Sequence, residues 1–150
     1  MQTKTKFDLR AVLLSTIANF SPWLAAVLLI TWFGYPGVVC VTPMAWLLAV
    51  RVGIVCSDRS RSETTSARLT EAALAGALLG LLLGILYMVI VPLMGPIQPD
   101  EQANNTKFTL IFLASGVLAS TVISLFAAVG VENRKRKKAS FKQVETNQEF

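Results

Sequence analysis

The side chains that most often carry catalysis or bind metals are scarce in this sequence. The chain of 150 residues has no histidine, which is the commonest zinc and copper ligand and the usual general base. Its two cysteines, Cys40 and Cys56, are sixteen residues apart. In a helix that separation is roughly 24 Å, whereas a disulfide needs Cα atoms within about 7 Å. We therefore expect each cysteine to be a small buried side chain, and we predict no metal site, no haem and no evident cofactor.

Acidic residues are also absent from the long apolar segments of the chain. No Asp, Glu, Lys or His lies within residues 11–33, 38–56, 72–94 or 108–131. The other residues show no phosphate-binding glycine loop, no metal-ligand spacing and no catalytic triad pattern. We therefore predict that the protein is not an enzyme and has no catalytic residue. A small transporter ranks low, because proton-coupled transporters usually place a carboxylate in mid-membrane.

The four apolar segments predict an all-α integral membrane protein. Hydrophobic residues make up 53% of the chain and charged residues only 15%, whereas a soluble domain has about 25% charged residues. Each segment is close to the roughly 20 helical residues that cross a bilayer core. We expect four transmembrane helices, arranged as two antiparallel hairpins, in a membrane domain over residues 1–131. The first segment exceeds the about 7–15 apolar residues of a signal peptide and is expected to be retained. Whether the second is continuous or broken at Pro43 stays open.

The basic residues predict how the four spans are oriented. With four spans, thirteen of the 14 Lys and Arg residues fall on the side that holds both termini and the loop of residues 57–71. Lys and Arg in short loops stay on the cytoplasmic side. We therefore expect both termini in the cytoplasm and a multi-pass protein of a plasma or inner membrane. On the opposite side, Asn104 begins an N-glycosylation acceptor pattern, whose use the sequence does not decide.

A basic, polar tail over residues 132–150 follows the last span. Its run of positive charge is expected to bind anionic lipid headgroups at about 1 kcal/mol per charge. The run consists of Arg134, Lys135, Arg136, Lys137 and Lys138. No aromatic side chain is interleaved with these residues to stack bases, so we predict no nucleic-acid partner. Docking of a soluble partner on the tail is the remaining alternative.

Three polar residues of the predicted spans are candidates for a functional role. Asn19 and Ser21 lie beside a proline, where the missing backbone N–H predicts a kink. We expect them to satisfy the freed backbone groups or to bond a neighbouring helix, with a polar pocket as the alternative. Arg51 is the one charge within a span. We expect it to snorkel to the cytoplasmic interface or to pair with Asp58 or Glu71, with a gating or substrate role as the alternative.

Small residues recur at every fourth position in the third and fourth spans. Residues four apart share one helix face, so Gly76, Gly80 and Gly84 form a shallow groove that lets another helix pack closely. The matching residues of the fourth span are Gly116, Ser120, Ser124 and Ala128. For an antiparallel pair at matched depth, we expect Gly84 against Ser120, Gly80 against Ser124 and Gly76 against Ala128.

These features favour assembly over chemistry. We expect a non-catalytic accessory or structural subunit that packs against other helices in a larger membrane complex. The alternative is a self-associating small pore or holin-like protein, in which the glycines line a ring of copies. The expected partners are membrane lipids, including anionic headgroups and bound lipid, and other membrane subunits or copies of the chain itself.

Overall fold

Four α-helices form the part of the chain that the computed structural model describes, and this part contains no strand. The backbone is described for residues 7–32, 37–93 and 99–148, and the side chains for residues 7–29, 44–89, 107, 110, 111 and 113–141. The helices are α1 (Leu9–Trp32), α2 (Gly37–Arg59), α3 (Thr65–Leu93) and α4 (Pro99–Gln148). The prediction of an all-helical fold is therefore confirmed over the described residues.

Three stretches of these helices are long and apolar enough to cross a membrane: Leu9–Leu29, Thr65–Val89 and Leu113–Phe141. They indicate a membrane protein and correspond to the first, third and fourth predicted spans. The described side chains of α2 begin at Met44, which leaves too short a stretch to test the second span. That span stays a prediction, although the backbone of α2 is helical from Gly37 through the positions of Thr42 and Pro43. Asn104 and Cys40 have side chains outside the described residues.

The helix ends differ from the predicted ends, most of all in α4. This helix has 50 residues and continues through the tail as far as Gln148, where we expected a separate polar segment. Neither glycine nor proline follows Gly130, and the tail is rich in Lys, Arg, Glu and Gln, which are good helix formers. Nothing in the tail therefore stops the helix. Local caps extend other helices: the Asp8 carboxylate accepts a hydrogen bond from the Ala11 N–H at 3.1 Å, at the start of α1.

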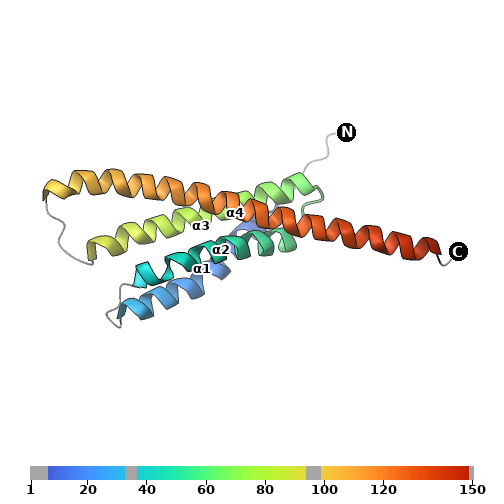
Figure 1. Cartoon of the computed structure of the whole chain (residues 1–150), viewed down its shortest axis with the longest axis horizontal. Helices are drawn as coiled ribbons and strands as arrows, with labels where there is room; N and C mark the ends of the chain where they lie inside the picture. The colour runs from blue at the N-terminus through green and yellow to red at the C-terminus, as the bar shows by residue number, and fades with distance from the viewer. Residues whose placement is uncertain (1–6, 33–36, 94–98, 149–150) are drawn as a thin grey trace.

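Helices α3 and α4 form the most extensive helix pair, and α2 packs against both of them. Helix α1 packs on α2 and α3 and, within the described residues, does not contact α4. Toward the C-terminal end of α1 and the N-terminal end of α4 the helices fan apart (Figure 1). At the opposite end α4 continues alone beyond the other three helices, and this part is drawn in red in Figure 1.

The core consists mostly of small side chains, which lets the helices approach one another closely. It comprises Val12, Ala49, Val52, Cys56, Ala72, Ala75, Leu79 and Ala128. Cys56 is a free, buried thiol in this core. Larger apolar side chains face outward on every helix; examples are Leu28, Leu47, Ile85 and Phe126. This arrangement, with small residues inside and large apolar residues outside, is the one expected of helices packed within lipid.

Candidate functional site

Two of the three α3 glycines pack directly against the backbone of α4. A Cβ atom added to Gly76 would lie 2.5 Å from the carbonyl oxygen of Ser120 and 2.6 Å from Ser124 Oγ. A Cβ added to Gly80 would lie 2.7 Å from the Cα of Val117. The Ser120 hydroxyl donates a hydrogen bond to the Gly76 carbonyl oxygen at 2.8 Å. The absence of side chains at these glycines is therefore what allows α3 and α4 to come this close.

The register of α3 against α4 is not the one that the sequence led us to expect. We expected Gly76 to face Ala128 and Gly84 to face Ser120. Instead, Gly76 faces Ser120 and Ser124, which lie four to eight residues, or about one to two helical turns, from the expected partner Ala128. Gly84 faces Leu113, whose Cβ lies 3.5 Å from the position of an added Cβ. A repeat of small residues every four positions looks the same after a shift of four, so other contacts must select the register.

Helix α2 supplies those contacts through Ser124. The Ser124 hydroxyl donates a hydrogen bond to the Ala49 carbonyl oxygen of α2 at 2.7 Å. A Cβ added to Gly53 would lie 2.8 Å from the backbone C and Cα atoms of Ser124. Ser124 is therefore held between Gly53 on α2 and Gly76 on α3. Sequence reasoning missed Gly53, although small residues recur at every fourth position of α2, at Ala45, Ala49, Gly53 and Ser57.

The other small residues of α4 have different surroundings. Ala128 is fully buried in the core. Gly116 is half-buried, and an added Cβ there would meet nothing within 4 Å. The carbonyl oxygen of Gly116 nevertheless lies 2.9 Å from the position of a Cβ on Gly80. Gly116 therefore contacts α3 through its carbonyl oxygen, while the space in which its own side chain would lie is open.

A charged cluster joins three helices at the end of the bundle where α2 ends and α3 begins. Glu132 of α4 accepts hydrogen bonds from the Ser57 hydroxyl at 3.0 Å and from an Arg68 guanidinium nitrogen at 3.4 Å. Lys135 lies 3.5 Å from Glu132 and 3.1 Å from Asp58. Glu132 follows the predicted span of residues 108–131. Burial alone would raise its pKa, but the hydrogen bond from Ser57 and the charges of Lys135 and Arg68 outweigh burial, so the pKa lies below its usual value.

Glu71 forms a second buried polar contact beside this cluster. Its carboxylate is fully buried and accepts hydrogen bonds from the Asp8 backbone N–H at 2.7 Å and from the Ser62 hydroxyl. The start of α1, the connection before α3 and α3 itself are thereby joined. Neither expected partner of Arg51 contacts it: Asp58 pairs with Lys135, and Glu71 is bonded as just described. Arg51 is exposed and pairs with neither residue, so snorkelling to the interface and the alternative gating or substrate role both stay predictions.

The two polar residues of α1 differ in their environment. Asn19 is buried, and its side-chain amide donates a hydrogen bond to the Ser15 carbonyl oxygen of the same helix at 2.6 Å. Ser21 is exposed. The structure therefore does not bring Asn19 and Ser21 together in a polar pocket, and α1 is helical across the intervening positions and Pro22.

The basic run of α4 divides into two faces. Lys135 donates to the Ser57 carbonyl oxygen at 3.2 Å, and Arg136 to the Thr65 hydroxyl at 3.4 Å, so both are directed toward the bundle. Arg136 is nevertheless exposed. Arg134, Lys137 and Lys138 are exposed too. Spacings of three and four residues place these three on one helix face. They are available to lipid headgroups, whereas Lys135 serves the charged cluster.

Replacing Arg134, Lys137 and Lys138 together with Gln is expected to weaken binding of an anionic phospholipid by about fivefold per charge, since each contact with the headgroups contributes about 1 kcal/mol. The measurement is the number of phosphatidylglycerol molecules that the purified protein retains in mixed-lipid nanodiscs. Lys135→Gln is the matched control and should leave lipid retention nearly unchanged. Equal losses from the two variants would contradict the division into two faces.

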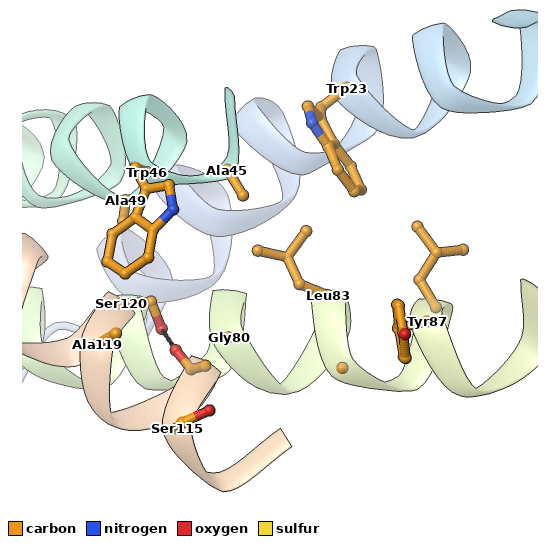
Figure 2. A pocket seen from close by; sticks show the side chains of 13 residues that line it. Trp23, Ala45, Trp46, Ala49, Gly80, Leu83, Tyr87, Ser115, Ala119 and Ser120 are labelled. Atoms are coloured by element: carbon orange, nitrogen blue, oxygen red, sulfur yellow. Dashed lines mark hydrogen bonds between the residues drawn. The ribbon is translucent and has the colours of Figure 1, made fainter. Parts of the chain in front are cut away.

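A cavity of about 260 Å³ lies among the helices, away from the charged cluster and toward the end where the helices fan apart. All four helices contribute to its lining, which consists of Trp23, Ala45, Trp46, Ala49, Gly80, Leu83, Gly84, Leu86, Tyr87, Ser115, Gly116, Ala119 and Ser120. Figure 2 shows the aromatic rings of Trp23, Trp46 and Tyr87 on different sides of this space. Four residues that we expected to serve only helix packing, namely Gly80, Gly84, Gly116 and Ser120, therefore also border a cavity.

The described residues thus form a charged cluster at one end of the bundle and a cavity bordered by apolar side chains, small residues and three aromatic rings. Comparison of the chain with protein-family models, with curated proteins and with solved structures finds no match.

Proposed function

We propose that this protein is a non-catalytic integral membrane subunit that assembles with other membrane polypeptides. In this proposal four spans form two antiparallel hairpins, with both termini in the cytoplasm. The polar contacts support it: Asp8 lies against Glu71, and Ser57 and Arg68 lie against Glu132, at the same end of the bundle. The basic run of α4 at residues 134–138 lies at this end too, as expected for a cytoplasmic face.

The observation that carries the proposal is the free extension of α4. Beyond Arg136 the described side chains, residues 137–141, are all exposed, and Phe141 is 72% exposed. Ten residues of helix separate Phe141 from Val131, or roughly 15 Å, whereas the headgroup layer on one side of a bilayer is only about 5–8 Å thick. Aromatic side chains are enriched at protein–protein interfaces and among their hot spots, so we propose that Phe141, beyond the headgroups, anchors a protein partner.

The structure gives less support to a pore lined by the α3 glycines. Such a ring requires the face of Gly76 and Gly80 to be free for another copy, but α4 of the same chain covers it. A homo-oligomer therefore remains an outcome of the test rather than a second proposal.

Native mass analysis of the untagged protein, extracted gently from its own membrane, tests the proposed function. We expect a fixed stoichiometry with at least one other polypeptide, and we expect Phe141→Ala to lower the recovery of that polypeptide by at least about tenfold. Lys107→Gln, at an exposed position near the other end of α4, is the control and should leave it unchanged. A ring of this chain alone, with conductance in planar bilayers, would contradict the proposal.

A further inference from the structure

We propose that the cavity holds a hydrocarbon chain of a membrane lipid, drawn from the leaflet farther from the charged cluster. The cavity is bordered by Trp46 of α2, Gly80 and Tyr87 of α3, and Ala119 of α4, together with Trp23 of α1. This inference requires the membrane placement of the helices. It does not require that the protein be a subunit of a complex.

The depth of the cavity places it in the hydrocarbon region. Along α3, Gly80 and Tyr87 lie nine and sixteen residues beyond Glu71, or roughly 14 Å and 24 Å at the rise of an α-helix. The hydrocarbon core of a bilayer is about 30 Å thick. With Glu71 at one boundary, the cavity therefore extends from about the middle of the core into the half that belongs to the opposite leaflet. A molecule that enters the cavity at this depth therefore comes from the acyl chains of the bilayer.

The polar atoms around the cavity leave little for water to bind. The Ser120 hydroxyl donates to the carbonyl oxygens of Gly76 and Gly116, and Ser115 and Tyr87 each have an interaction partner. The Nε1 atom of Trp23 is buried and has no hydrogen-bond partner, but Figure 2 shows the six-membered ring of this indole, and not its nitrogen, extending toward Leu83. An ordered water needs two to four polar partners, and apolar cavities without them stay dry. The surface presented to an occupant is therefore hydrocarbon.

The size and the opening of the cavity suit a chain rather than a headgroup. An apolar cavity of about 150 Å³ accommodates benzene, so about 260 Å³ accommodates a segment of several methylene groups. Trp46, at its border, is 52% exposed. The helices also fan apart in this direction (Figure 1). A chain can enter from the side, and none of the described residues that border the cavity carries a charge to hold a phosphate.

Gly116 offers a direct way to fill the cavity. It borders the cavity, and a Cβ added to it meets nothing within 4 Å, so Gly116→Leu adds a side chain without displacing backbone. Gly130 is the matched control, because an added Cβ there also meets nothing within 4 Å, but Gly130 is exposed and does not border the cavity. Ala45→Leu provides a second, independent filling variant from α2.

The experiment measures lipid that remains with the protein after reconstitution in dioleoylphosphatidylcholine and extraction into a delipidating detergent, by native mass spectrometry. We expect one retained lipid on the wild-type protein and on Gly130→Leu, and at least tenfold lower retention on Gly116→Leu and Ala45→Leu. Thermal unfolding confirms that each variant is folded. Three results would overturn the proposal: no retained lipid on the wild type, unchanged retention on both folded filling variants, or loss only when Arg134, Lys137 and Lys138 are replaced with Gln.

Discussion

Replacing Gly53 or Gly76 with alanine is expected to lower the free energy of unfolding by about 2–3 kcal/mol, near the upper end of the usual cost of overpacking a core. Both glycines lie against Ser124. The Gly53 methyl group would meet only backbone atoms of Ser124, and the Gly76 methyl group would meet the Ser120 carbonyl oxygen at 2.5 Å. Backbone cannot rotate away, so α2 or α3 must move away from α4 and lose contacts along its whole length.

Gly84, Gly116 and Gly130 supply a graded set of controls for that prediction. Gly84→Ala meets the flexible end of Leu113, which can move, and should cost less than about 1 kcal/mol. Gly116→Ala and Gly130→Ala meet nothing within 4 Å, and the better helix propensity of alanine should make them neutral or stabilising by up to about 1 kcal/mol. The measurement is reversible unfolding in mixed micelles. Equal costs at all five positions would show that contact with α4 does not decide the effect.

Replacing Glu132 with Leu is expected to lower the free energy of unfolding by about 2–3 kcal/mol. The substitution removes three contacts at once, from Ser57, Arg68 and Lys135, while the two cations remain. Breaking a buried ion pair costs about 3–5 kcal/mol, and the lower figure applies because the Arg68 and Lys135 side chains are 28% and 41% exposed and can reach water. Unfolding in mixed micelles measures this difference as well.

Asp58→Asn is the matched control for Glu132→Leu, because Asp58 is the exposed partner of the same lysine. Its side chain is 55% exposed, so the substitution should cost less than about 1 kcal/mol. The pH dependence gives a further check. The pKa of Glu132 is lower in the folded protein, so its contribution is present above the usual pKa of a glutamate and is lost as the pH falls through the lowered value. The stabilities of wild type and Glu132→Leu should therefore converge at low pH, and a constant difference would contradict the ion-pair account.

The elements of this fold follow from the sequence more closely than their ends do. Long apolar segments predict helices because an apolar membrane segment must satisfy its backbone groups internally. The end of α4 was predicted at Val131, since the apolar pattern stops there. The helix continues because charged residues with good helix propensity follow and nothing caps it. Hydropathy marks where a helix leaves lipid, not where it ends.

The packing residues were only partly predictable. The spacing of Gly76 and Gly80 identifies the face of α3 that α4 contacts, but a four-residue repeat cannot fix the register. That choice depends on Ser124 between Gly53 and Gly76, and on Glu132 between Ser57 and Arg68. Both are contacts of three helices, and the sequence pattern of one or two helices does not contain them. The cavity has the same origin, because its lining comes from all four helices.

Disulfide formation between α3 and α4 tests most directly the central claim that these helices pack within one chain in the observed register. The position of a Cβ on Gly84 lies 3.5 Å from Leu113 Cβ, within the range of about 3.5–4.5 Å found in disulfides. In a background without Cys40 and Cys56, Gly84→Cys with Leu113→Cys should cross-link rapidly within one chain on mild oxidation in the membrane. Gly84→Cys with Ser120→Cys, seven residues or roughly 10 Å farther along α4, should not. Preferential cross-linking of the second pair, or links mainly between copies, would contradict the account.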